Sequence, residues 1–130
     1  MNYTTIEQSK KLLELGLKPD TADMYWMDWK RDTNSITIPN IKGVIDEKDL
    51  PCWSAGALMD LLPTTIWNED TEDSFDLFFT KDNDSYFTKD NDTEYSISYN
   101  NNYENPFAEY GGLIDTLVKT IEWLLTNKYI

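Results

Sequence analysis

The chain has 130 residues and a formal net charge of −13, contains no histidine, and is 40% hydrophobic and 14% aromatic. Such an aromatic content predicts a folded globule rather than an acidic disordered chain, and the length suits a single domain over residues 1–130. The charge disfavours direct nucleic-acid binding, because phosphate contacts need clustered Lys and Arg, and it equally disfavours adsorption to anionic membranes.

The N-terminal residues predict a short helix. Thr4 and Glu7 have the spacing of a capping box, and Gly16 stands where a left-handed residue would end the helix. Two strands are predicted next, over residues 25–29 and 36–38, and Pro39 places the second of them at a sheet edge. A further short strand at residues 44–45 is possible within the following loop.

Residues 50–63 predict a compact helical segment. Ser54 is a good N-cap for a helix over residues 55–62, and Pro63 prevents its continuation. Leu58, Leu61 and Leu62 fall on one face, so this short helix should be buried or nearly so.

Residues 68–94 are the most acidic part of the chain, with ten Asp and Glu against two Lys and a net charge of −8. Inside them, residues 79–85 return almost unchanged as residues 87–93. Asn and Asp tolerate positive φ, so each Asp-Asn-Asp predicts a tight turn between strands at 75–81, 85–89 and 93–100. Aromatic and aliphatic residues alternate with small polar ones there, which predicts one core face and one solvent face.

A long helix is predicted over residues 107–125, with Asn105 as its cap and Pro106 in its first turn. Gly111 and Gly112 would each cost about 1 kcal/mol inside it, which predicts a close approach to a neighbouring element. The expected fold class is therefore α+β: an antiparallel β-meander of four to six strands, packed by N-terminal, short central and long C-terminal helices.

Catalytic chemistry has little support in the sequence. Without histidine, the commonest general base and most nucleophile systems are missing, so we expect a non-enzyme that needs no cofactor. Cys52, the only cysteine, stands at a helix entrance that could activate a thiol, but packing beside Trp53 is the simpler interpretation. A lone cysteine, the lack of a long apolar run and the absence of a signal-peptide pattern predict a cytoplasmic protein.

A calcium site is the weak metal candidate. Asp90, Asp92 and Glu94 match the first ligand positions of a calcium loop. Tyr95 occupies the position that needs glycine, and Asn101 replaces the last acidic ligand. We therefore expect solvated turns and no specific metal site.

Protein binding is the interpretation that the acidic segment favours. The belt could imitate nucleic-acid phosphates and occupy a basic surface of another protein, or it could serve solubility alone. Trp26 and Trp29 are three positions apart, so on one strand their side chains would point to opposite faces. One of them could therefore be exposed as a binding anchor. The candidate contact residues are Glu69, Asp70, Glu72, Asp73, Asp82, Asp84, Asp90, Asp92, Trp26 and Trp29.

The central segment contains a pattern that is similar to one in a known group of small proteins. Its residues are Pro51, Trp53, Ser54, Ala57, Leu58, Leu61, Leu62 and Pro63. With the ending that starts at Asn105 and Pro106, it resembles small uncharacterised proteins from phages and mobile elements of gut-type bacteria. The resemblance implies an accessory protein, of a kind that includes host-defence inhibitors, and implies no catalytic residue.

Two functions are therefore expected, and a metal- or carbohydrate-handling enzyme that uses carboxylates is a minor third alternative. The first is an acidic accessory protein that binds a protein partner, such as a host-defence or nucleic-acid-handling protein. The alternative is a protein that sequesters a nucleotide signal, using cations of the nearly neutral N-terminal part: Lys10, Lys11, Lys30, Arg31, Lys42 and Lys48. A homo-oligomer is also possible, if the apolar face of the last helix packs against a second copy.

Overall fold

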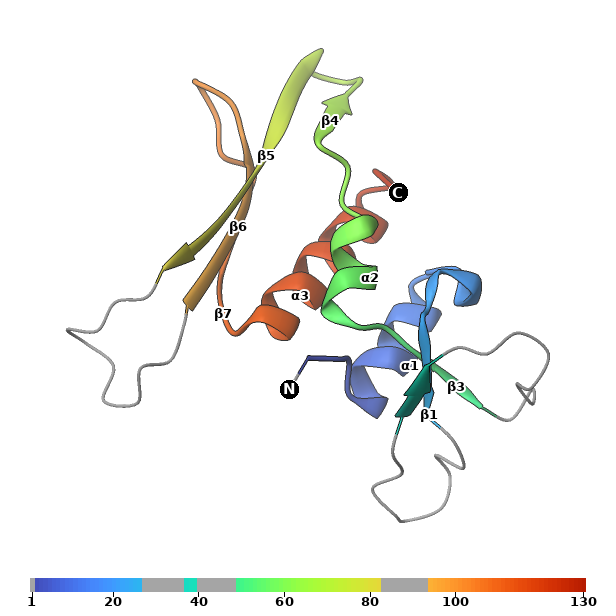
Figure 1. The fold of residues 1–130 in the computed structure, drawn as a ribbon. Coiled ribbons are helices and arrows are strands. Elements are labelled where there is room, and N and C mark those ends of the chain that lie inside the picture. The colour runs from blue at the N-terminus through green and yellow to red at the C-terminus, as the bar shows by residue number, and fades with distance from the viewer. Residues whose placement is uncertain (1, 27–36, 40–48, 83–93) are drawn as a thin grey trace. The chain divides into compact units, whose positions relative to one another are not determined.

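The computed structural model (Figure 1) describes residues 2–26, 37–39, 49–82 and 94–130, in which helices and antiparallel strands follow one another in the order α1-η1-β1-β2-β3-α2-β4-β5-β6-β7-α3. The expected α+β class with an antiparallel meander is confirmed. The strands form two sheets, and the chain divides into two compact units, Met1–Leu61 and Leu62–Ile130. That the whole chain folds as one domain stays a prediction.

The first unit contains a three-stranded sheet of order β2-β1-β3. Its elements are α1 (Ile6–Glu14), the 3-10 turn η1 (Pro19–Thr21), β1 (Met24–Trp26), β2 (Thr37–Pro39), β3 (Leu50–Cys52) and α2 (Ala55–Asp60). Pro39 lies in an edge strand, as expected, and α1 packs against β3. The strand predicted at residues 44–45 lies outside the described residues.

The ends of α1 follow from local hydrogen bonds. Its capping box uses Thr5 and Gln8, one residue later than the predicted pair Thr4 and Glu7. The shift occurs because Thr4 is fully buried and its backbone already pairs with Trp53. Gly16 ends the helix as expected, with φ +102°, and the N–H of Leu17 donates to the carbonyl of Leu12 at 3.0 Å.

Thr4 holds the first unit together through both its backbone and its hydroxyl. Its N–H donates to the carbonyl of Trp53 at 2.9 Å, and the N–H of Trp53 donates to Thr4 Oγ1 at 3.1 Å. The same hydroxyl shares a 2.8 Å hydrogen bond with Ser9 Oγ, and Trp26 Nε1 donates to the carbonyl of Thr4 at 3.2 Å. One small polar residue thus joins the N-terminal segment, α1, β1 and the end of β3.

The short helix α2 begins as predicted. Ser54 accepts a hydrogen bond from the N–H of Ala57 at 3.1 Å, and Asp23 accepts one from the N–H of Ser54 at 2.9 Å. The helix ends at Asp60, two residues before the predicted end. Leu58 is fully buried, whereas Leu61 and Leu62 are half-buried.

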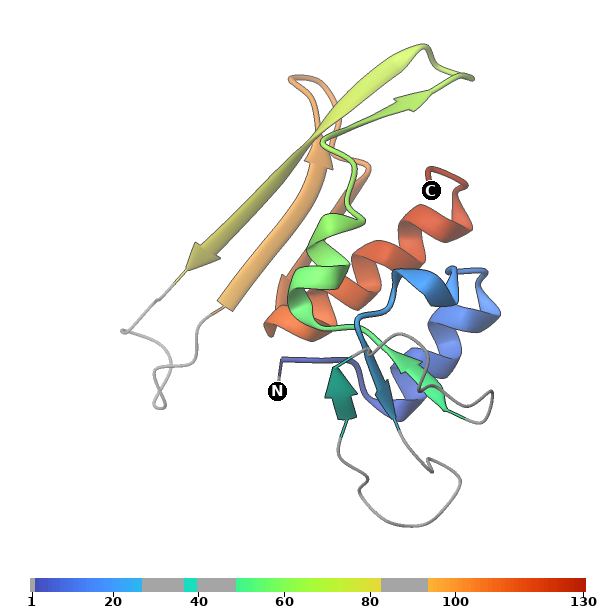
Figure 2. The same ribbon diagram turned by 45° about the vertical axis from the view of Figure 1, so that its right-hand side comes forward.

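The second unit is a four-stranded meander of order β4-β5-β6-β7 with one long helix. Its elements are β4 (Thr65–Asn68), β5 (Asp73–Asp82), β6 (Glu94–Asn100), β7 (Phe107–Gly111) and α3 (Leu113–Thr126). Figure 2 shows the long strands β5 and β6 running side by side. The helix α3 packs against β6 and β7.

The strand next to β5 differs from the prediction. Residues 85–89 were expected between residues 75–81 and 93–100, but β5 pairs directly with β6, from Asp76 opposite Asn100 to Asp82 opposite Glu94. Residues 85–89 themselves lie outside the described residues. The pairing sets Leu77 beside Tyr99 and Phe79 beside Ile97, and such apolar cross-strand pairs stabilise the direct β5–β6 register.

The helix predicted from residue 107 is the main correction. Residues 107–111 form strand β7, paired with β6 from Tyr99 opposite Phe107 to Tyr95 opposite Gly111, and α3 begins only at Leu113. Gly111 has φ +136°, which a helix cannot contain, and Gly112 is the N-cap. The glycine pair therefore separates strand from helix, and Pro106 precedes a strand.

A pair of glycine substitutions tests this boundary. Gly111→Ala should lower the free energy of unfolding by about 1–2 kcal/mol, because a side chain is strained at φ +136°. Gly112→Ser should change it by less than about 0.5 kcal/mol, because serine suits an N-cap and no atom lies within 4 Å of a Cβ there. Urea denaturation measures both, and a gain in stability for Gly111→Ala would support the continuous helix instead.

Removing the Thr4 hydroxyl tests the centre of the first unit. Thr4→Val should cost about 2 kcal/mol, because it leaves the N–H of Trp53 buried without its acceptor. Thr4→Ser keeps the hydroxyl and should lose less. Thr80→Val, at an exposed threonine of β5, is the control and should stay within about 0.5 kcal/mol in the same denaturation experiment. Equal losses for Thr4→Val and Thr80→Val would contradict this role of Thr4.

Candidate functional site

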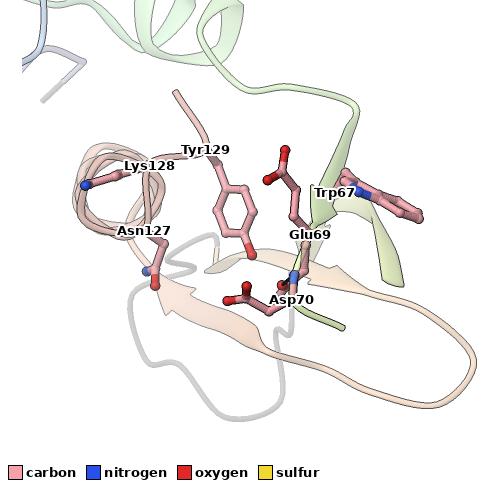
Figure 3. A pocket seen from close by; sticks show the side chains of 7 residues that line it. Trp67, Glu69, Asp70, Asn127, Lys128 and Tyr129 are labelled. Carbon is pink, nitrogen blue, oxygen red and sulfur yellow. Dashed lines mark hydrogen bonds between the residues drawn. The ribbon is translucent and has the colours of Figure 1, made fainter. Parts of the chain in front are cut away.

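A cavity of about 500 Å³ in the second unit contains two of the predicted contact residues. It lies between the β4–β5 turn and the residues that follow α3 (Figure 3). The residues that line it are Trp67, Asn68, Glu69, Asp70, Asn127, Lys128 and Tyr129.

The β4–β5 turn presents the two carboxylates of the cavity. Asn68 Oδ1 accepts hydrogen bonds from the backbone N–H groups of Asp70 at 3.0 Å and Thr71 at 3.4 Å, which folds the turn on itself. Glu72 completes the turn with a positive φ of 56°. The turn therefore holds Glu69 and Asp70 at its exposed end.

The opposite side of the cavity is built by the end of α3. Lys128 adopts φ +60°, the N–H of Tyr129 donates to the carbonyl of Leu124 at 2.8 Å, and that of Lys128 donates to the carbonyl of Leu125 at 3.2 Å. This is the same helix-ending motif as at Gly16, here made by a residue with a side chain. It directs Tyr129 back onto Trp123, with ring centroids 5.3 Å apart.

Trp123 connects this wall to the sheet. Its ring stacks on Phe107 of β7 at 4.8 Å and on Tyr99 of β6 at 6.0 Å. The hydroxyl of Tyr99 donates to the carbonyl of Pro63 at 2.7 Å, and burial raises the pKa of this hydroxyl. Tyr129 is thus fixed through an aromatic cluster rather than left as a mobile end.

The electrostatics of the cavity favour a cation. In Figure 3 the carboxylates of Glu69 and Asp70 extend toward the side of Tyr129, while Lys128 points the other way. Within the described ranges, neither carboxylate forms an ion pair. Two carboxylates beside an aromatic ring can accept hydrogen bonds from an ammonium or guanidinium group and add a cation–π contact.

The other predicted contact residues are placed differently. Glu72 is exposed in the same turn, Asp73 is half-buried at the start of β5, and Asp82 ends that strand. Trp26 is 9% exposed, in a core cluster with Leu50 and Cys52, so it does not contribute an exposed anchor. Outside the described residues lie Trp29, Asp84, Asp90 and Asp92.

Sequence reasoning missed Trp67 and Tyr129 as members of the site. Trp67 is 54% exposed and alternates with buried Ile66, which a two-residue pattern over the short strand β4 could have revealed. Tyr129 had no such signal, because its position depends on the turn of the chain after α3.

Metal and membrane sites find no support among residues 2–26, 37–39, 49–82 and 94–130. Glu94 is exposed on β6, its predicted co-ligands Asp90 and Asp92 lie outside these ranges, and no three His, Cys, Asp or Glu residues within them gather as metal ligands. At 14 residues, α3 is the longest helix described, and no helix in these ranges could cross a bilayer.

The first unit has a cavity of about 520 Å³ whose chemistry does not suit an anion. Asp23 and Asp60 line it together with Thr21, Ser54, Gly56 and Ala57, and no lysine or arginine among the described residues does so. Lys10 and Lys11 lie at exposed positions of α1, while Lys30, Arg31, Lys42 and Lys48 lie outside the described residues. No cavity feature of the described residues therefore supports the nucleotide-binding alternative.

Cys52 is fully buried, which favours packing over reactivity. Burial raises the pKa of its thiol from 9.0 to about 11, an effect that the Thr4 hydroxyl partly offsets and that nearby Asp23 reinforces. The thiol donates a hydrogen bond to the carbonyl of Thr4 at 3.4 Å. At neutral pH the group is therefore a protonated thiol within the core.

Thiol labelling tests this environment. At pH 8 the raised pKa lowers the thiolate fraction about a hundredfold, so iodoacetamide should modify the native protein at least that much more slowly than the urea-unfolded protein. Since the unfolded thiol loses its proton first, the free energy of unfolding should also fall as pH rises from about 9 to about 11. Equal labelling rates in the two states would contradict a buried thiol.

The chain matches no protein-family model, no curated protein and no solved structure at a significant level. What the protein does must therefore be inferred from its own residues. The acidic cavity between the β4–β5 turn and Tyr129 is the best starting point, because it brings predicted contact residues together with an ordered aromatic wall.

Proposed function

We propose that the protein is a non-catalytic acidic accessory protein that acts by binding a protein partner with a basic surface. The observation that supports this most directly is the exposed pair Glu69 and Asp70 beside Tyr129, with no cation of the described residues paired to either carboxylate. An arginine or lysine of the partner would enter the cavity and contact these side chains.

The charge of the whole chain supports the same kind of partner. A net charge of −13 creates a long-range field that attracts a basic surface before contact. Such steering mainly raises the association rate and weakens with salt. We therefore propose fast, salt-sensitive association, in which the cavity gives the contact its orientation.

The class of partner is proposed from charge and from the sequence resemblance together. Proteins that handle nucleic acids present basic surfaces to phosphates, and an acidic protein can occupy such a surface in their place. The resemblance to small proteins of phages and mobile elements makes a nucleic-acid-handling or host-defence protein of a bacterial host the proposed target. Blocking that surface would be the mode of inhibition.

Affinity purification from bacterial cells tests the proposal at low and high salt. The wild-type chain should recover a partner at low salt and release it at high salt. Glu69→Gln/Asp70→Asn should weaken binding of the purified partner at least about tenfold, because it removes both acceptors for the incoming cation.

A matched variant separates the site from the overall charge. Glu14→Gln/Asp20→Asn removes the same two charges from exposed positions of the first unit and should leave the affinity within about twofold. Recovery of no partner, or an equal loss of affinity for both double variants, would argue against the proposed site.

A further inference from the structure

The pairing register of the second unit defines two faces of its sheet. Residues directly opposite each other on paired strands share a face, and the face alternates along each strand. The face against α3 holds five buried apolar residues, namely Ile66, Phe75, Ile97, Tyr99 and Phe107. The opposite face, here called the open face, consists of the alternate positions of β4 to β7.

Three large aromatic side chains lie on the open face. Trp67 is opposite Ser74, Phe78 is opposite Ser98, and Tyr110 is opposite Ser96. They are 54%, 50% and 64% exposed, whereas Phe75, Tyr99 and Phe107 on the other face are buried. Together they expose about 350 Å² of aromatic surface, distributed over strands β4, β5 and β7.

The surface between the aromatic residues carries small polar side chains that are hydrogen-bonded to one another. Ser98 and Ala108 lie next to Phe78 across the sheet, and their side chains are too small to cover its ring. Asn100 Nδ2 donates to Ser98 Oγ at 3.0 Å, and Thr65 Oγ1 donates to Asp76 Oδ1 at 2.9 Å. These hydrogen bonds fix the polar side chains before any partner binds, which lowers the entropic cost of association.

The charge of the open face has one sign. Asp76 and Glu94 are exposed on it, and Asp82 is directly opposite Glu94 in the register. No lysine or arginine occupies a position of this face within the described strands. Lys81 lies on the opposite face, because it pairs with Tyr95. The exposed carboxylates of Asp76 and Glu94 therefore attract a cation from outside.

We propose that the open face docks a protein segment in which Lys or Arg alternates with apolar residues. Trp67, Phe78 and Tyr110 would receive the apolar side chains, while Asp76 and Glu94 would receive the cations. The negative charge disfavours nucleic acids and anionic lipids as occupants, because both carry the same sign.

This inference rests on the proposed function and extends its site. Trp67 lies on the open face and is also among the residues that line the cavity of Glu69 and Asp70, so the two surfaces meet at this residue. A partner would then place one cation in the cavity and lay the adjoining segment across the strands. The energy of such contacts is expected to concentrate in the aromatic residues, as at other interfaces.

A synthetic decapeptide of alternating Arg and Leu is the probe, titrated into the isotope-labelled full chain and followed by amide NMR. Shift changes should map to open-face positions of β5 to β7 such as Ser74, Ser98 and Tyr110. Phe78→Ala and Tyr110→Ala should each weaken binding about fivefold or more. Tyr103→Ala, at a 92% exposed tyrosine outside the strands, should leave it within about twofold.

The outcomes separate this inference from the proposed function. Binding that maps only to Glu69, Asp70 and Tyr129, and is unchanged in Phe78→Ala and Tyr110→Ala, would overturn the docking face while leaving the acidic cavity intact. No binding of the decapeptide at millimolar concentration would overturn both. A stronger response to oligothymidylate, to anionic vesicles or to a Glu-Leu decapeptide would overturn the proposed occupant. The amide spectrum of each free variant verifies that it is folded.

Discussion

The alternation of side chains across the four-stranded sheet is the constraint on which the second unit depends. Because successive residues point to opposite faces, the apolar set that packs toward α3 fixes which residues are left on the other side. Trp123 anchors this arrangement, stacking on Tyr99 and Phe107 of the sheet and on Tyr129 after the helix. The same packing thus produces the core, the wall of the acidic cavity and the open face.

The two units are stabilised by different interactions. In the first, a buried threonine supplies hydrogen bonds to Trp53, Ser9 and Trp26, so polar groups inside a small core are satisfied. In the second, aromatic stacking and long cross-strand pairs dominate. Both end a helix with the same left-handed motif, at Gly16 and at Lys128, but only the second places a side chain in a candidate site.

Exposed acidic and aromatic side chains that share a surface favour one kind of ligand. Exposed carboxylates alone raise solubility, and scattered exposed aromatic residues are common on any protein. Here Trp67 belongs both to the acidic cavity and to a sheet face with two further exposed aromatic rings. A basic segment with apolar residues is the ligand whose chemistry complements both properties, which gives the proposed binding function its physical basis.

The sequence by itself determined the local features: the Gly16 helix end, the Ser54 cap, the edge position of Pro39 and the two-residue alternation of β5. Each depends on neighbouring residues, so a local pattern is enough. Tertiary structure decided what depends on distant partners. Pairing with β6 made residues 107–111 a strand despite their helical spacing, burial in the core removed Trp26 from the surface, and the chain end after α3 brought Tyr129 to Glu69 and Asp70. No local pattern encodes those contacts, because their free energy comes from residues far apart in the chain.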